Sequence, residues 1–210
     1  MKDLRSGASR RPFVVTSTIA VLLAASMLPS AHAGNTWDGG GGNGNWSTAA
    51  NWDADTLPTF GTGITFAGAA NFVTNNDLAA LTVGGITFDP AQEAFVLDGN
   101  AITLSGGIND NSTGGQQMIN LPITLSGPQT VNVIEDAGLT IGPGVNGSGV
   151  ISGGGSLTKT GTGSLILGAA NTYTGATTLD GGALVYSAAN ALTALNFGFA
   201  PAATTVSPNV

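Results

Sequence analysis

Short runs of alternating apolar and polar residues recur along much of the chain from residue 61 onward. The clearest lie within Gly153–Ser187, at Ser156–Thr160, Ser164–Leu167, Ala176–Leu179 and Ala183–Tyr186. A period of two is that of a β-strand and puts Leu165 and Leu167 on the same face. Each run is too short to be stable alone, so many short strands separated by turn residues predict a solenoid of stacked rungs around a continuous core.

The strand motifs return at intervals near 20 residues. Ile64-Thr65-Phe66 recurs as Ile86-Thr87-Phe88 and Ile102-Thr103-Leu104 as Ile123-Thr124-Leu125, while Leu139-Thr140 is matched by Leu157-Thr158 and Leu165-x-Leu167 by Leu184-x-Tyr186. Three-sided rungs with corners of variable length would give such a drifting interval. An antiparallel β-sandwich is the alternative, because it also has a strand every 8–12 residues.

The segment Gly153–Ser187 resembles the autotransporter-associated β-strand repeat, a module of bacterial surface proteins. The positions that carry the resemblance are Gly155, Leu157, Lys159, Gly161, Gly163, Leu165, Leu167, Asn171, Tyr173, Gly175, Thr177, Gly181, Gly182 and Leu184. Gly168-Ala169 departs from the family, which more often has a small polar residue followed by glycine. The resemblance implies a right-handed parallel β-helix in a secreted passenger region of a Gram-negative bacterium. It implies no catalytic residues.

Residues 1–33 have the pattern of an export signal. Basic residues that include Arg10-Arg11 precede an apolar run over Phe13–Leu28, and Ala31-His32-Ala33 provides a cleavage site between Ala33 and Gly34. The apolar run is short for a membrane span and is interrupted by hydroxyl residues. Arg10-Arg11 also fits a twin-arginine motif, so the expected partner is either the Sec or the Tat export machinery.

All three tryptophans, Trp37, Trp46 and Trp52, fall within residues 34–60, a glycine-rich segment that resembles the opening of passengers with this repeat. The first rung of a solenoid has an uncovered core and an unpaired edge, and large indole rings can cover both. We therefore predict an N-terminal cap. The competing hypothesis is a carbohydrate-binding module in which the three indoles contact a glycan.

Residues 34–210 contain one basic residue, Lys159, and eleven acidic residues, which gives a formal charge of −10. Such a chain has no cationic surface for nucleic acid and would be repelled by anionic lipid. These residues contain no histidine and no cysteine, so Ser–His and thiol mechanisms and ordinary zinc sites are excluded. Carboxylate pairs such as Asp53/Asp55, Glu135/Asp136 and Asp89/Glu93 leave a polysaccharide-active enzyme as a weaker hypothesis, although solvated corner acids explain them as well.

The sequence thus predicts an all-β protein with a signal peptide at 1–33, a cap at 34–60, a β-solenoid at 61–197 and a tail or truncation point at 198–210. The expected function is a non-catalytic passenger or surface scaffold in adhesion or cell-surface display, without cofactor, metal or membrane anchor. Host or cell-surface glycans or proteins are the expected partners. The expected location is secreted or on the outer surface, with a periplasmic stage in transit.

Overall fold

The computed structural model describes residues 35–59, 61–90, 94–134, 137–143, 148–186, 195–197 and 205–208, the last two ranges through their backbone alone. All of them belong to one compact unit, Ala31–Val210. The predicted signal peptide at residues 1–33 and the cleavage site at Ala33 and Gly34 lie outside the described residues.

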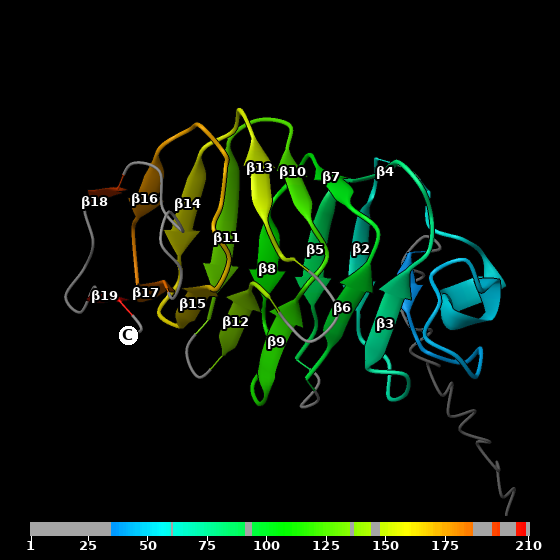
Figure 1. The fold of residues 1–210 in the computed structure, drawn as a ribbon. Coiled ribbons are helices and arrows are strands. Elements are labelled where there is room, and N and C mark those ends of the chain that lie inside the picture. Colours follow the sequence, from blue (N-terminus) through cyan, green and yellow to red (C-terminus); the bar gives the residue numbers. More distant parts are fainter. Residues whose placement is uncertain are drawn as a thin grey trace, which may run out of the picture. The chain divides into compact units, whose positions relative to one another are not determined.

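Three parallel sheets form a β-solenoid (Figure 1). Sheet A contains β1 (Thr36–Trp37), β2 (Gly63–Phe66), β5 (Gly85–Phe88), β8 (Ile108–Asp110), β11 (Gln129–Val133), β14 (Leu157–Thr160), β16 (Thr177–Leu179) and β18 (Leu195–Phe197). Sheet B contains β3 (Val73–Asn76), β6 (Val96–Gly99), β9 (Gln116–Ile119), β12 (Gly138–Ile141), β15 (Ser164–Leu167), β17 (Ala183–Tyr186) and β19 (Thr205–Pro208). Sheet C contains β4 (Leu81–Val83), β7 (Ile102–Leu104), β10 (Ile123–Leu125) and β13 (Ile151–Gly153).

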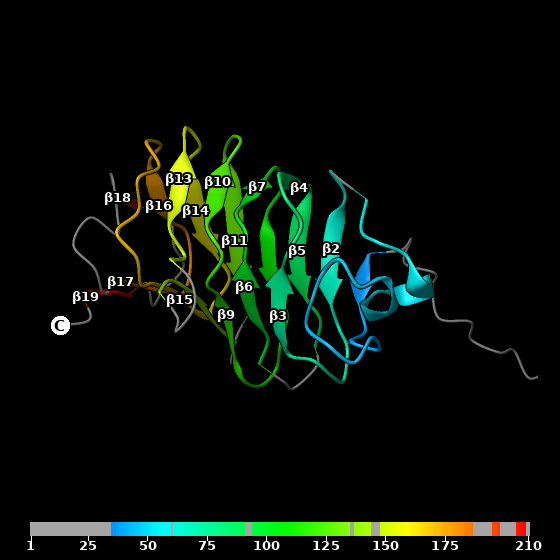
Figure 2. The ribbon, with the colours of Figure 1, turned by 45° about the vertical axis from the view of Figure 1, so that its right-hand side comes forward.

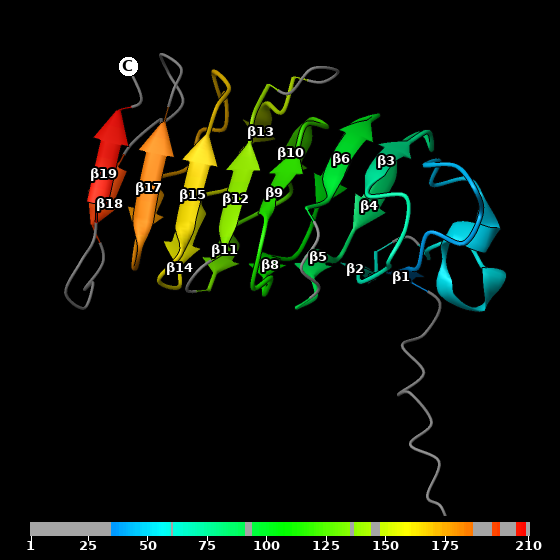
Figure 3. The same cartoon turned by 90° about the horizontal axis from the view of Figure 1, so that it is seen from below.

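From β2 to β13 the chain visits the sheets in the order A, B, C and returns to A, and after β13 its strands alternate between sheets A and B, so each strand pairs with its equivalent in the next rung. Figure 3 shows this for sheet B, where the strands from β3 to β19 lie side by side in chain order. Every pairing between the named strands is parallel. The solenoid prediction is therefore confirmed and the antiparallel sandwich is wrong.

Like residues stack on like residues in the interior. Ile64 pairs with Ile86, which pairs with Ile108, and all three are buried in the core. Each apolar position of an alternating strand points inward at the same height in every rung, so the stack buries one continuous apolar column. A single sequence period thus specifies both the strand and its place in the stack.

Three of the four recurrences read from the sequence give the observed register. Ile64 pairs with Ile86, Ile102 with Ile123 and Leu165 with Leu184. The match of Leu139-Thr140 with Leu157-Thr158 is wrong, because Leu139 is in sheet B and pairs with Leu165, whereas Leu157 is in sheet A. Equal side-chain patterns occur in both sheets, and the pattern alone does not say which side of the rung a strand occupies.

The tryptophan-rich segment packs on the first rung (Figure 2). β1 pairs with β2 and extends sheet A, while the backbone on either side of Asn45 hydrogen-bonds to Asn75 at the edge of sheet B. Two short 3-10 helices, η1 (Ala49–Asn51) and η2 (Asp53–Asp55), complete the segment, and no described residue is in an α-helix. Sheet A therefore starts within the predicted cap, earlier than residue 61.

Part of the predicted tail is also strand. Thr205–Pro208 forms β19, whose backbone pairs in parallel with β17 and continues sheet B. A proline has no N–H to donate, but Pro208 is the last residue of the strand, where one missing donor costs little. Sheet B therefore extends into the segment that the sequence analysis treats as a tail or truncation point.

Candidate functional site

The segment that resembles a known repeat begins where sheet C ends. β14 and β15 continue sheets A and B after β13, but residues 168–176 form no strand on the third side, and the chain returns to sheet A at β16. We call residues 157–186, from the start of β14 to the end of β17 (Ala183–Tyr186), the repeat segment. It is two-stranded per turn, whereas the preceding rungs from β2 to β13 contribute one strand to each of the three sheets.

The third side of the repeat segment still hydrogen-bonds to β13. The backbone N–H groups of Thr172 and Thr174 donate to the carbonyl oxygens of Ile151 and Gly153 at 2.8 and 2.9 Å. In the other direction, the Ile151 N–H donates to the side-chain Oδ1 of Asn171 at 2.8 Å. Asn171 thus supplies the acceptor that a strand backbone supplies elsewhere, which satisfies a buried donor at the end of sheet C.

Tyr173 fills the interior beside this irregular side. Its side chain has no exposed surface, and its hydroxyl is hydrogen-bonded to the Thr177 hydroxyl. A buried tyrosine needs such a partner for its polar end, because an unpaired hydroxyl would be costly in the core. The large ring therefore provides core volume on the side where the inward-facing residues of a sheet C strand are missing.

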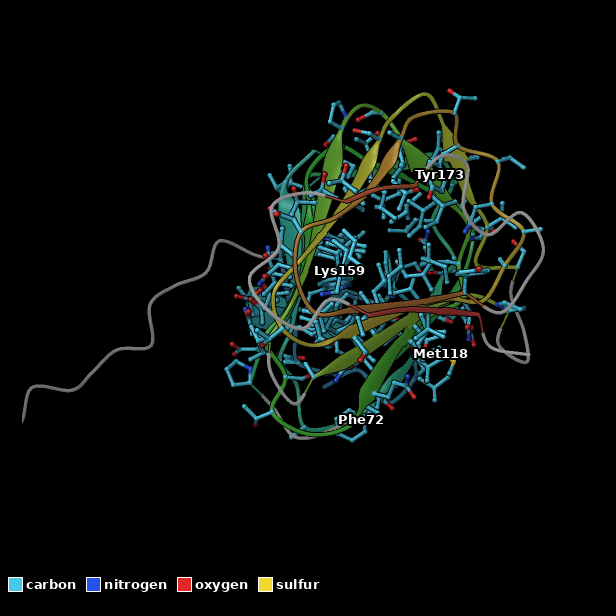
Figure 4. All side chains as sticks on the ribbon, turned by 90° about the vertical axis from the view of Figure 1, so that its left-hand side faces the viewer. Phe72, Met118, Lys159 and Tyr173 are labelled. Atoms are coloured by element: carbon cyan, nitrogen blue, oxygen red, sulfur yellow. The ribbon has the colours of Figure 1, made fainter. Side chains whose placement is uncertain are left out.

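Lys159 lies inside the solenoid and is fully buried (Figure 4). It occupies the inward position that Val131 holds in the previous rung and Leu179 in the next. Its Nζ donates to the carbonyl oxygens of Thr160, Gly161 and Gly181 at 2.6, 3.0 and 3.2 Å. These three bonds use all the protons of an ammonium group and join the corners of two successive rungs.

Burial lowers the pKa of Lys159 to about 8, because the charged form is removed from water. The corner that its ammonium group binds depends on Gly161, which has a φ of +74°. A Cβ at Gly161 would lie 2.2 Å from the carbonyl oxygen of Val133, so the rungs can approach this closely only with glycine there. Lys159 and Gly161 are therefore parts of the corner structure of the repeat segment.

The three tryptophans form the end of the core. Trp37, Trp46 and Trp52 all have no exposed surface and pack around Phe66 with ring centroids 6.2, 5.8 and 6.3 Å from it. The Trp46 Nε1 donates to Thr74 Oγ1 at 3.0 Å, and the Trp52 Nε1 donates to the Trp46 carbonyl oxygen at 2.9 Å. A sugar ring cannot stack on any of these indoles in this arrangement, so the geometry gives no support to the carbohydrate hypothesis based on them.

Three of the candidate carboxylates are described: Asp53 and Asp55 belong to η2, and Asp89 follows β5. Asp53 Oδ1 accepts a hydrogen bond from the Thr36 N–H at 2.9 Å and helps to hold β1, while Asp55 and Asp89 are exposed. Glu93, Glu135 and Asp136 lie outside the described residues. Within the described part of the chain, no group of three acids, histidines or cysteines is placed to hold a metal ion.

Outward-facing residues form their own columns. On sheet A, Thr36, Thr65 and Thr87 are in register, and the column continues through Asn109, Asn132 and Thr160. On sheet C, Thr82, Thr103, Thr124 and Ser152 are in register. These columns are not among the sequence predictions. Their signal is the threonine at the centre of each repeated Ile-Thr-Phe or Ile-Thr-Leu, which must face outward at the same height in successive rungs.

A comparison with protein-family models matched residues 157–185 to the passenger-associated transport repeat. The chain carries this repeat. The match covers the segment in which Lys159, Gly161, Asn171 and Tyr173 are found. Comparisons with curated proteins and with solved structures gave no match. No helix among the described residues has the length and apolar character needed to span a membrane.

Proposed function

We propose that this protein is an exported passenger scaffold whose β-solenoid displays its outer faces at a bacterial cell surface. The observation that carries the proposal is the passenger-associated transport repeat at residues 157–185, whose strands continue sheets A and B of the same solenoid. A parallel β-solenoid needs no cofactor or disulfide to be rigid, because each rung is hydrogen-bonded to both neighbours.

The proposed role is structural. Residues 34–210 contain neither histidine nor cysteine, and the one lysine in that range is buried against backbone carbonyl oxygens. Adhesion would then use exposed corners and sheet faces, where side chains are presented at the regular spacing of the strands. Outward columns such as Thr82, Thr103 and Thr124 support such a role, because they present hydrogen-bonding groups at the regular spacing of the strands.

Surface display can be tested with an epitope inserted after Gly42, an exposed turn residue with open space around its Cα. In the bacterium that encodes the protein, we expect the antibody to label intact cells and external protease to remove the label. The same epitope inserted after the buried Leu165 is the control for misfolded protein. Labelling that requires permeabilised cells would contradict surface display.

Adhesion needs a separate measurement. Cells that carry the gene and cells that lack it should differ in attachment to glycan-coated or protein-coated surfaces, and protease treatment of intact cells should remove the difference. Equal attachment of both strains to every surface would contradict adhesion and leave the display proposal to the epitope result.

A further inference from the structure

The outer face of sheet A has a shallow groove beside the tryptophan-rich end. Its volume is about 300 Å³, at the lower end of ligand pockets, and it is lined by Thr36, Thr65, Ala67, Thr87 and Asp89. Thr36, Thr65 and Thr87 come from β1, β2 and β5 and stand in register across the three strands. Ala67 and Asp89 each follow a buried phenylalanine by one residue and therefore face outward again.

The polar groups of the groove are not used by the protein. In the described part of the chain, the three threonine hydroxyls and the Asp89 carboxylate have no hydrogen-bond partner. Several hydroxyls outside the groove are occupied. Ser105 and Ser126 Oγ donate to the carbonyl oxygens of Val83 and Leu104, and Thr160 Oγ1 donates to Asn132 Oδ1.

The charge of the groove restricts the ligand. Asp89 is its only ionisable group, and the only basic side chain among the described residues, Lys159, is buried. A phosphate, sulfate or uronate would meet a carboxylate without any compensating cation, so anionic ligands are disfavoured. A bare cation is also poorly served, because Ca²⁺ requires six to eight oxygen ligands and one carboxylate supplies at most two.

We propose that this groove binds an uncharged oligosaccharide that lies across the strands, with its hydroxyl groups on Thr36, Thr65 and Thr87. Adjacent strands are about 4.8 Å apart, so the three hydroxyls repeat at an interval close to the length of one sugar ring. Asp89 accepts hydrogen bonds from the sugar hydroxyls at one end of the groove, and the small Ala67 leaves room for a ring. The site would give the proposed surface scaffold a ligand and in that sense rests on the proposed function.

Binding to the purified full chain tests the site without reference to its location in the cell. The probes are hexamers of glucose in α-1,4 and β-1,4 linkage, the hexamer of N-acetylglucosamine, its deacetylated cationic form, hexagalacturonate and CaCl₂ alone. Calorimetry should detect at least one neutral hexamer with a Kd on the order of 1 mM, which is modest because no exposed aromatic ring lines the groove. No binding of any neutral hexamer would overturn the proposal, as would tighter binding of the cationic hexamer, of hexagalacturonate or of Ca²⁺ than of every neutral hexamer.

Variants locate the binding. Thr65→Val and Thr87→Val keep the shape of the side chain but remove a hydroxyl, and each should weaken binding about five- to tenfold; Asp89→Asn should weaken it at least as much. Ala67→Leu fills the groove and should abolish binding, whereas Thr65→Ser should retain it. Thr158→Val is the matched control, because Thr158 faces outward on sheet A outside the groove.

Melting temperatures of all variants should stay close to the parent, since these side chains face solvent. An equal loss of binding in Thr158→Val and Thr65→Val would overturn the assignment, and so would unchanged binding in Ala67→Leu. The epitope labelling of intact cells does not depend on the groove. A negative binding result would therefore contradict the sugar site and leave the surface-display proposal unaffected.

Discussion

The tryptophan-rich end and the repeat segment both build part of a rung without a sheet C strand, and they do so by different means. At the tryptophan-rich end, Trp37 and Trp52 pack edge to face with centroids 5.2 Å apart, and Trp46 packs edge to face on Trp52 at 5.9 Å. In the repeat segment, Asn171 and Lys159 hydrogen-bond directly to the backbone of the rungs. The tryptophan-rich end is thus stabilised by buried apolar volume, and the repeat segment by hydrogen bonds from side chains to the backbone.

The difference follows from position in the stack. At the tryptophan-rich end, rings cover the outer side of the core as far as Phe66, so volume is the main requirement. The repeat segment has a rung on each side, so its core needs no end cover, and the backbone groups at the broken sheet are the costly feature. Single polar residues at fixed places meet that need, which is why this rung has a recognisable sequence signature.

Trp52→Ala should give the largest effect, because it removes the ring that contacts both other indoles and Phe66. We expect a loss of about 3–5 kcal/mol in the free energy of unfolding, measured by urea denaturation followed by circular dichroism. Trp52→Phe should cost less, and Leu57→Ala, at a side chain that is 47% exposed, should cost under about 0.5 kcal/mol. A loss below about 1 kcal/mol in Trp52→Ala would mean that the indoles do not stabilise this end.

Asn171→Ala should have the next largest effect, and it tests whether side-chain hydrogen bonds stabilise the repeat segment. The change leaves the Ile151 N–H without its acceptor in a buried place, which costs about 1–3 kcal/mol. Thr172→Ala is the matched control, because Thr172 is exposed and contributes its backbone N–H, which alanine retains. Equal urea midpoints for the two variants would show that the side-chain acceptor is not needed.

The sequence predicted the strands of the repeat segment almost to the residue. Runs expected at Ser164–Leu167 and Ala183–Tyr186 coincide with β15 and β17, because strict alternation and glycine corners leave one possible register. The sequence also predicts a cap that contains the three tryptophans, and the structure buries them against the first rung. Local pattern is informative wherever one face of a strand must enter the core.

Three-dimensional neighbours were harder to predict. Pairing Leu139 with Leu157 failed because the spacing between equivalent strands changes across the longer connection before β13, and intervals alone do not record which sheet a strand joins. The missing sheet C strand in the repeat segment also left no signal in the alternation. The groove at Thr65 and Asp89 depends on the register of strands from different rungs, which the sequence alone does not determine.

Lys159 should make the stability of the protein depend on pH. Its pKa is lowered by burial to about 8, from 10.5. Below about pH 8 the Lys159 amine is protonated in both the folded and the unfolded chain. Between pH 8 and 10.5 it is protonated to a greater extent in the unfolded chain, so the free energy of unfolding should rise with pH in this window. In Lys159→Met this rise should be absent.

The measurement is the urea midpoint of the parent and of Lys159→Met from pH 7 to pH 10.5. The difference between the two midpoints should change in favour of the parent as the pH rises, whatever its value at pH 7. Taking the difference removes the contributions of the titratable groups that both proteins share. Parallel curves over the whole range would contradict a buried amine with a lowered pKa.

The smallest expected effect lies between the two regions, at Asp110 in β8. This carboxylate is fully buried; Oδ1 accepts hydrogen bonds from the N–H and hydroxyl of Ser112, whereas Oδ2 has no partner among the described residues.

Burial raises the pKa of Asp110 above its ordinary value of 3.8, so the unfolded chain loses its proton first and this residue's contribution to stability falls as the pH rises through and above 3.8. Asp110→Asn should therefore stabilise the protein by about 1 kcal/mol at pH 7, with a smaller gain below pH 4. Asp180→Asn, at an exposed acid, is the control for net charge. An equal gain in both variants would attribute the effect to the strong negative charge of the chain. A gain confined to Asp110→Asn would show that the unpaired Oδ2 of Asp110 costs stability in the rungs between the two ends.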